Sequence, residues 1–319
     1  MNIHVTLNNE IIDVDSYLRT LLASPFPELN PIFQDLSQSK GKRVRAQYCS
    51  CCYHLFQSHS IPSLISVSSA IELIHLATLV HDDVIDDATL RRHQPSIQAK
   101  YGKDMAIYAG DYLFTEYFSL IRQFDKTDPV LADAHITVMK TILAGELIQK
   151  EDYFDLEQSI ETSWNVMKKK TGALIALSGF CGAHLAGASF EEQQLCAEIG
   201  LLIGCLFQIT DDLLDITQNA NSTGKNSQHD FMEGIYTLPL LMVYHQDKAF
   251  FNHLLTPQLT QEENIQVIRR IIELGGVEKT YDIIKKIQKR IHHLMEKLPQ
   301  NDWNQFLIEL VNQLTHRQS

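Results

Sequence analysis

Apolar side chains recur along most of the chain at the spacing of an amphipathic α-helix. In residues 64–80 the apolar positions are three or four apart and form one stripe along a helix face. That stripe comprises Leu64, Val67, Ile71, Ile74 and Thr78. The same period predicts further helices at 105–124, 133–149, 171–185, 191–216, 265–274, 281–298 and 301–314. Strict two-residue alternation is confined to the first dozen residues and is weak there, so we predict an all-α fold.

Short polar or proline-containing segments interrupt this pattern, and none is long enough to be a domain linker. They lie at 24–27, 60–62, 125–129, 219–229 and 256–263. We therefore expect residues 1–319 to form one large helical domain, with the polar stretch 219–229 as a candidate lid.

Composition narrows the class of protein. The chain is 45% apolar and 21% charged, as in ordinary soluble domains, and its net charge of −12 speaks against a nucleic-acid binder. The N-terminus shows no signal peptide, and the six cysteines form no C-x-x-C pair, which favours a reduced, cytoplasmic protein without a zinc site. The uncharged stretch Gly172–Phe190 is rich in small residues and contains His184, so we expect a buried helix and no transmembrane segment.

Two aspartate clusters carry the strongest chemical signal. The first is the run DDVIDD at residues 82–87, which ends an apolar helix pattern. On a helix Asp82 and Asp86 point the same way, and like charges at that spacing need a compensating cation. The second run, DDLLD at residues 211–215, ends another apolar helix. A solvated helix end would explain one acidic run, but two copies in equivalent contexts indicate a binding site. Carboxylate oxygens suit Mg²⁺ completed by substrate phosphates, so two facing clusters are expected to hold several Mg²⁺ ions against one diphosphate.

Basic residues are grouped where an anionic substrate would need them. They cluster in GKRVR at 41–45, in RR at 91–92 and in KKKTG at 168–172, and Lys225 lies in the polar stretch. Arginine forks match phosphate oxygens, and lysine supplies point charge. Each group alone is more often a solvated face, but together with the paired aspartates they predict a pocket that binds two diphosphates.

The order and spacing of these pieces resemble the trans-isoprenyl (polyprenyl) diphosphate synthases over roughly residues 37–242. The matching pieces are GKRVRA, IHLATLVHDDVIDDATLRR, KTG, FQITDDLLD, TGK and YTLP. The first region most resembles the medium- and long-chain bacterial enzymes, including the catalytic subunit of heptaprenyl diphosphate synthase. The resemblance implies a helical bundle of the isoprenoid synthase type with a central active-site cavity.

The resemblance also implies roles for individual residues. Contacts to isopentenyl diphosphate fall on Lys42, Arg45, His75 and Arg92. Contacts to the allylic diphosphate fall on Arg91, Lys170 and Lys225. The main Mg²⁺ ligands are Asp82, Asp86 and Asp211, supported by Asp83, Asp212 and Asp215. The site where the allylic cation forms is lined by Thr171 and Gln208, which complete the catalytic set with Lys170.

Two positions depart from the family pattern. His93 stands where a glycine usually follows the arginine pair, and Ile235 replaces the second lysine of a G-K-x-T-L-P motif. One diphosphate contact is therefore missing, and we expect the lid to close differently.

The implied chemistry is electrostatic. Three Mg²⁺ ions and the basic side chains neutralise the allylic diphosphate so that it can leave, which produces an allylic carbocation in an apolar pocket. The double bond of isopentenyl diphosphate attacks this cation head-to-tail, and the departed diphosphate takes the proton. The implied product is an all-trans polyprenyl diphosphate of the kind that supplies quinone side chains.

The resemblance implies a dimer, either of identical chains or with a small regulatory subunit, and transient membrane contact for product release. Two other classes are weighed against it. A class I terpene cyclase would show one D-D-x-x-D run and a different second metal motif, whereas DDLLD and the cations Lys42 and Arg45 favour a synthase. A non-catalytic partner subunit would show degenerate aspartate clusters, and both clusters here are intact.

Product length is expected to depend on the helix that carries Asp82. One turn before Asp82 lie Ala77 and Thr78, which are small where short-chain relatives typically place an aromatic ring. The next turn offers Ile74, and one turn rises about 5.4 Å, roughly one isoprene unit. We predict a product longer than twenty carbons; the competing interpretation is that Ala77 and Thr78 only pack at a helix crossing.

Overall fold

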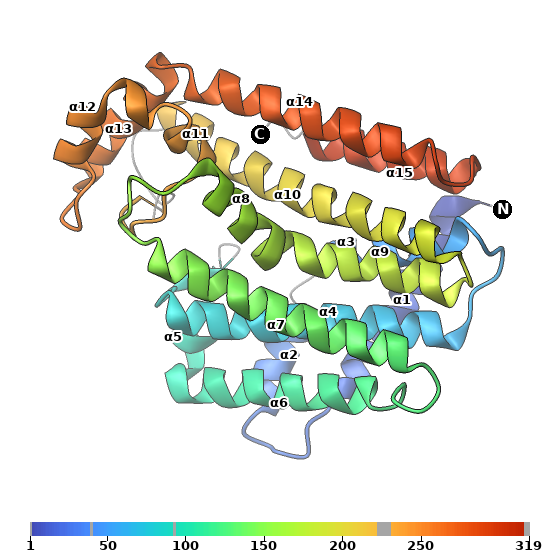
Figure 1. Cartoon of the computed structure of the whole chain (residues 1–319). Helices are drawn as coiled ribbons and strands as arrows, with labels where there is room; N and C mark the ends of the chain where they lie inside the picture. Colours follow the sequence, from blue (N-terminus) through green and yellow to red (C-terminus); the bar gives the residue numbers. More distant parts are fainter. Residues whose placement is uncertain (1, 39–40, 92–93, 222–230, 316–319) are drawn as a thin grey trace. The chain divides into compact units, whose positions relative to one another are not determined.

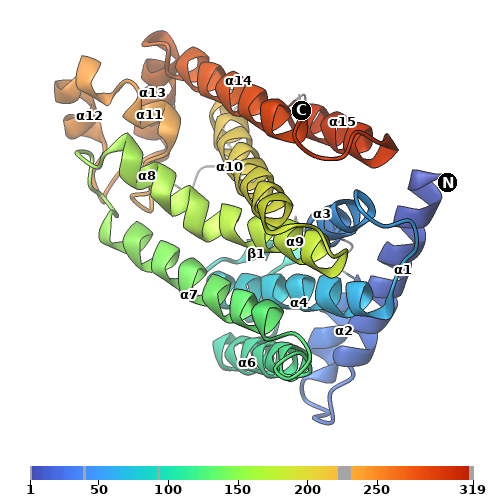
Figure 2. The same cartoon turned by 45° about the vertical axis from the view of Figure 1, so that its right-hand side comes forward.

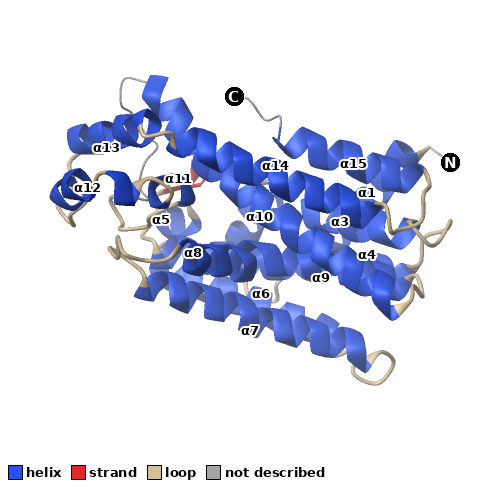
Figure 3. Ribbon diagram, turned by 45° about the horizontal axis from the view of Figure 1, so that its top comes forward, coloured by secondary structure: helices blue, strands red, loops and turns tan. Residues whose placement is uncertain are grey.

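The computed structural model is helical almost throughout and describes residues 2–38, 41–91, 94–221 and 231–315 (Figures 1 and 3). The predicted all-α fold is confirmed. Within these residues the only strands are β1 (Leu90–Arg91) and β2 (Gln94–Pro95), which pair as a small antiparallel hairpin that the sequence pattern did not predict.

The helices follow one another with short connections. In chain order they are α1 (Ile3–Leu21), α2 (Asn30–Gln38), α3 (Val44–His54), α4 (Pro62–Ile85), α5 (Ile97–Tyr101), α6 (Lys103–Ile121), α7 (Pro129–Glu151), α8 (Ile160–Met167), α9 (Ala173–Leu185), α10 (Phe190–Asn221), α11 (Leu238–Leu241), α12 (Lys248–Leu254), α13 (Gln261–Glu273), α14 (Gly276–Met295) and α15 (Asp302–Thr315). A π-helical turn, η1 (Lys168–Gly172), joins α8 to α9, and a 3₁₀ turn, η2 (Tyr244–Gln246), follows α11. Each helix predicted from the apolar period has a counterpart here.

The weak alternation in the first dozen residues was misleading, because these residues belong to α1. The Asn2 side chain caps the first turn by accepting from the backbone N–H of Val5. Leu7, Val14 and Leu18 then follow at helical spacing and are buried. Packing of this buried face against other parts of the protein stabilises the helix, and a short stretch of local sequence does not reveal that packing.

Contacts divide the chain into two compact units. Unit 1 comprises residues 1–137, 177–197 and 301–303, and unit 2 comprises residues 138–176, 198–300 and 304–319. The boundaries fall within α7, α9, α10 and α15 and in the connection between α14 and α15. A single domain over residues 1–319 with a central cavity therefore stays a prediction.

In unit 1, α4 is the central helix and packs along α6, with α1 and α3 on other sides (Figure 2). The predicted stripe on α4 is buried from Leu64 to Ile74, while Thr78 is half-buried. Gly110 of α6 faces the His81 ring so closely that a Cβ there would overlap it. By length and composition alone, α4 is the one described helix that could cross a membrane, but most of it is buried within the protein.

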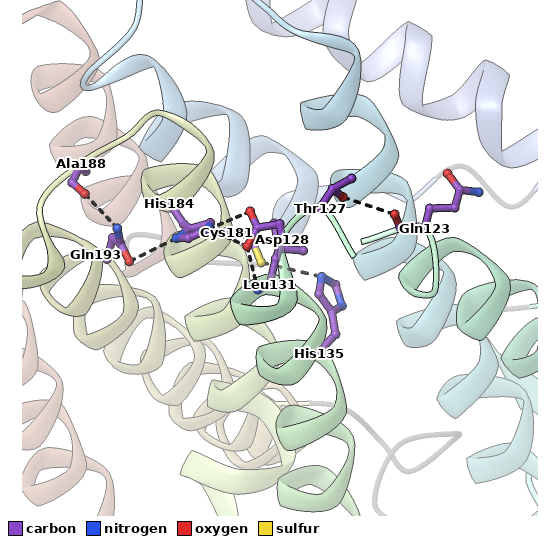
Figure 4. A network of polar contacts seen from close by, with 9 residues as sticks. All are labelled: Gln123, Thr127, Asp128, Leu131, His135, Cys181, His184, Ala188 and Gln193. Atoms are coloured by element: carbon purple, nitrogen blue, oxygen red, sulfur yellow. Dashed lines mark hydrogen bonds and ion pairs between the residues drawn. The ribbon is translucent and has the colours of Figure 1, made fainter. Parts of the chain in front are cut away.

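A chain of polar contacts in unit 1 fixes α9 (Figure 4). His184 Nε2 lies 2.8 Å from Asp128 Oδ2, and Gln193 contacts the other ring nitrogen of His184. Deeper in the same region, the buried His135 ring lies near the Cys181 thiol, and burial lowers the pKa of His135 to about 3. The prediction of a buried helix is confirmed for α9, whereas the end of the predicted stretch is a turn and Phe190, the exposed first residue of α10. All six cysteines are buried free thiols.

Candidate active site

The first aspartate cluster lies where α4 ends, at Ile85. Carboxylates at the C-terminal end of a helix face the negative end of its dipole, so the cluster is electrostatically unfavourable without a cation. Asp82 is half-buried and Asp86 is exposed, whereas only 3% of Asp83 is exposed. The carboxylates of this cluster therefore occupy two different environments.

Two of these carboxylates are paired with basic residues of the same unit. Arg91 in β1 donates from Nε to both oxygens of Asp83 at 2.8 Å, and its Nη2 lies 2.8 Å from Oδ1. Burial raises the pKa of Asp83, and Arg91 offsets only part of that rise. Asp87 lies 2.8 Å from Lys103 Nζ, a bond that lowers the pKa of Asp87.

The predicted isopentenyl diphosphate contacts also begin in unit 1. His75 lies two turns before Asp82 on the same face of α4, and both are half-buried. Lys42 is exposed and Arg45 is half-buried. Their neighbour Arg43 instead bonds Asp15 at 2.8 Å, so this cation of the cluster is structural.

Several predicted positions cannot be placed. Arg92, His93 and Lys225 lie outside the described residues, as does most of the candidate lid. Ile235 is half-buried and follows Gly234, which has a left-handed φ of 82°.

In unit 2 the basic run KKKTG forms the π-helical turn η1. Such turns are rare and are frequently found at functional sites. Lys170 Nζ lies 2.8 Å from Glu146 Oε2 and 2.7 Å from Gln149 Oε1, both on α7. Sequence reasoning missed Glu146 and Gln149, although their i, i+3 spacing places both on one face of a helix.

Glycines allow unusually close helix approach around η1. A Cβ on Gly204 of α10 would lie 2.6 Å from the Cα of Gly172, and a Cβ on Gly145 of α7 would lie 2.9 Å from the backbone N of Lys170. Real Cβ atoms essentially never come that close. Any larger side chain at Gly204 or Gly145 would therefore displace the turn that carries Lys170 and Thr171.

The second aspartate cluster lies along α10. Asp211 is half-buried, Asp215 is exposed, and only 7% of Asp212 is exposed. Thr171 Oγ1 donates to Gln208 Oε1 at 3.0 Å, and Gln208 Nε2 donates to Asp212 Oδ1 at 2.9 Å. The structure thus links Thr171 and Gln208, to which the resemblance gave one role, with Asp212, to which it gave another.

The donor set in each cluster fits Mg²⁺. The first and last carboxylates of each D-D-x-x-D run offer oxygen ligands and are at least partly exposed to solvent. Mg²⁺ is usually held by one or two carboxylates plus waters and substrate phosphates. Among the described residues, no three His, Cys, Asp or Glu side chains form a closed metal cluster. The individual ligand assignments stay predictions.

The residues predicted to set product length differ in exposure. Ala77 is 0% exposed and Ile74 is 1% exposed, both within the core of unit 1. Thr78 is half-buried, and its hydroxyl donates to the His75 carbonyl oxygen at 2.9 Å. Of the two positions one turn before Asp82, only Thr78 lies on the face that Asp82 occupies.

Comparison with known proteins agrees with this picture. Residues 26–274 match the polyprenyl synthetase family pattern. Heptaprenyl diphosphate synthase component 2 of Geobacillus stearothermophilus is 33% identical over 308 residues, which cover 95% of this chain and 94% of the relative.

Solved structures of similar proteins share the fold. Geranylgeranyl pyrophosphate synthase from Lactobacillus brevis is 32% identical, with a TM-score of 0.92 over 98% of this chain and 97% of that one. A polyprenyl synthase from Caulobacter crescentus, complexed with calcium and isoprenyl diphosphate, is 25% identical, with a TM-score of 0.90 over 99% and 97%.

Proposed function

The chain belongs to the polyprenyl synthetase family, a family of prenyltransferases, and we propose that it joins isopentenyl diphosphate head-to-tail to an allylic diphosphate in an Mg²⁺-dependent reaction. The observation that carries this proposal is the duplicated D-D-x-x-D run, one in each unit, each beside basic residues. The calcium and isoprenyl diphosphate bound to the Caulobacter relative are consistent with a divalent cation and an anionic isoprenoid substrate.

The chain's own residues then have distinct tasks. Asp82, Asp86 and Asp211 would hold Mg²⁺, up to three ions, which supplies the positive charge that makes the allylic diphosphate a leaving group. Lys170, which bonds Glu146 and Gln149, is assigned to bind that diphosphate. No proton acceptor on the chain is required, because the departed diphosphate can take the proton released on condensation.

The second substrate would bind through unit 1. Lys42, Arg45 and His75 are assigned to the isopentenyl diphosphate anion, together with Arg92. Because His75 shares a face of α4 with Asp82, one helix would orient both the anion and the metal ligand. Proximity of this kind is the main contribution a protein makes to joining two bound molecules.

We further propose a product longer than twenty carbons. Thr78 is not aromatic and lies on the Asp82 face of α4, and the turns before it offer the aliphatic side chains of Ile74 and Ile71. His75, on the same face, is assigned to the isopentenyl diphosphate anion. Names of relatives include both heptaprenyl and geranylgeranyl products, so family membership does not fix product length, and we assign that role to these residues.

A dimer is the proposed assembly in the cytoplasm, with product release at a membrane surface. Ile107, Tyr108 and Phe118 of α6 are exposed although they are large and apolar. Such a face favours association with a second copy of the chain or with a small regulatory subunit. The alternative, a non-catalytic or partner-dependent subunit of a heteromeric synthase, is not favoured, because both aspartate clusters are intact although Ile235 replaces a lysine.

Single substitutions in the two clusters test the proposal. Asp82→Ala and Asp211→Ala should each lower turnover by orders of magnitude with the fold retained, while Asp13→Ala, at an exposed aspartate of α1, should be neutral. Circular dichroism checks the fold, and incorporation of labelled isopentenyl diphosphate measures turnover. Near-normal turnover in either cluster variant would refute the two-cluster proposal.

A further inference from the structure

The two aspartate clusters share a pattern of burial that their sequence does not show. In each D-D-x-x-D run the second carboxylate is buried, at 3% exposure for Asp83 and 7% for Asp212. The first carboxylate of each run is half-buried and the last is exposed. Each buried carboxylate accepts hydrogen bonds from a neighbouring polar side chain in its own unit.

In unit 1 the buried carboxylate fixes the plane of an arginine. Both oxygens of Asp83 accept from the Nε and Nη2 edge of Arg91, at 2.8 Å. A guanidinium carries five N–H donors in a rigid fork, so this contact leaves the Nη1 end able to bind an anion. A long side chain on a two-residue strand would otherwise sample many rotamers.

In unit 2 the buried carboxylate fixes the direction of a hydrogen-bonded chain. A carboxylate can only accept, so Asp212 must receive the N–H of Gln208. The amide oxygen of Gln208 therefore faces Thr171 and accepts its hydroxyl proton. Because this proton is used in the bond to Gln208, the lone pairs of Thr171 Oγ1 remain available to stabilise positive charge. Hydrogen bonds in a chain polarise one another, which strengthens this effect.

We propose that the second aspartate of each run is a positioning residue: Asp83 orients Arg91 toward the allylic diphosphate, and Asp212 orients Gln208 and Thr171 toward the developing cation. The inference rests on the proposed function. Mg²⁺ dehydrates reluctantly and usually keeps several waters, so Asp82, Asp86 and Asp211, which reach solvent at least in part, would be its ligands. The two buried members serve the substrate through other side chains.

Kinetics separate these roles. Asp212→Asn can present either its amide oxygen or its amide N–H to Gln208, so the direction of the Gln208–Thr171 bond is no longer fixed. This should lower kcat about 10–100-fold, as loss of a supporting hydrogen bond commonly does, with the Mg²⁺ requirement unchanged. Asp83→Asn should instead raise the KM of the allylic primer. Asp82→Asn, at a proposed metal ligand, is the contrast and should raise the Mg²⁺ concentration needed for half-maximal rate.

A rescue variant distinguishes positioning from mere structural damage. In Asp212→Asn/Gln208→Glu the carboxamide at 212 donates to a carboxylate at 208, which again accepts the Thr171 hydroxyl. This restores the bond direction, so kcat should recover most of the loss seen in Asp212→Asn. A double variant no faster than Asp212→Asn would overturn the inference for this unit.

A binding measurement keeps the inference testable even if the wild-type chain makes no product. Titration calorimetry of Mg²⁺ with inorganic pyrophosphate is carried out on the full chain and on Asp82→Asn, Asp83→Asn and Asp212→Asn. Mg²⁺ affinity should fall in Asp82→Asn and persist in the other two. An equal loss of Mg²⁺ binding in all three folded variants would refute the positioning role, whereas normal binding without turnover would refute only the proposed function.

Discussion

A single methyl group at Gly204 should test whether the π-helical turn has to lie where the structure places it. In Gly204→Ala the new Cβ would lie 2.6 Å from the Cα of Gly172 and 3.1 Å from the carbonyl oxygen of Thr171. Ordinary van der Waals contact begins at 3.4 Å, so the backbones must separate by 3.4 − 2.6, or about 0.8 Å. Both obstructing atoms belong to backbone, which cannot swing away as a side chain would.

The expected costs differ for stability and for turnover. Overpacking costs about 1–3 kcal/mol, and replacing glycine by alanine inside a helix returns about 1 kcal/mol, so the free energy of unfolding should fall by about 0–2 kcal/mol. The Thr171–Gln208 bond is 3.0 Å long, and a shift of about 0.8 Å would take it beyond hydrogen-bond distance. Misplacement of roughly this size lowers turnover about 100-fold.

Chemical denaturation and initial rates with saturating Mg²⁺ measure the two effects on the same preparation. Gln194→Ala, at an exposed position of α10, is the matched control and should leave turnover unchanged. The reasoning predicts a folded Gly204→Ala protein whose turnover falls far more than its stability. Wild-type turnover in that variant would show that the close approach of α10 to η1 has no role in catalysis.

Other parts of the chain give three predictions. Burial raises the pKa of Glu10, but hydrogen bonds from His54 and two serines outweigh it, so the net pKa lies below the ordinary 4.5. The stabilisation by ionised Glu10 is therefore present above pH 4.5 and is lost as pH falls through the lower pKa of the folded state. Glu10→Gln should lower the free energy of unfolding at neutral pH by about 1–3 kcal/mol, and that free energy should then fall less steeply with acidification than in the wild type. Thr78→Phe should stop elongation near fifteen to twenty carbons with the first condensation intact, whereas Ala77→Phe, at a fully buried site, should mainly lower the melting temperature. An unchanged product distribution in Thr78→Phe would show that the growing product does not run along this face of α4. Tyr108→Asp should shift the mass measured by light scattering from dimer to monomer, and an unchanged mass would exclude this α6 face from the interface.

The sequence predicted the helices in which the apolar repeat continues over many residues and the buried face is wide. Helix α4 is the clearest case, since its stripe from Leu64 to Ile74 is buried as the spacing required. The first helix was missed because its N-terminal half is polar and its buried positions are sparse. The strands β1 and β2 were missed because a two-residue ladder has no detectable alternation.

The sequence predicted which types of residue form the candidate site, but not which of these side chains bond to which partners. The aspartate runs and the KKKTG segment stand out by composition, whereas the partners of Asp83 and Lys170 depend on chain folding over longer range. Nothing in local sequence distinguishes Asp83 from Asp82, since both follow the same apolar helix. Consecutive helix residues point about 100° apart, and this separates the buried carboxylate of Asp83 from the more accessible one of Asp82.

The most direct test of the account is condensation by the purified chain alone. Labelled isopentenyl diphosphate is supplied with Mg²⁺ and each of several allylic diphosphates, and product length is read by chromatography after removal of the diphosphate. The account predicts head-to-tail products longer than twenty carbons, which disappear when a chelator removes the metal and return when Mg²⁺ is restored. Absence of any condensation product from folded, dimeric protein with every primer would contradict it.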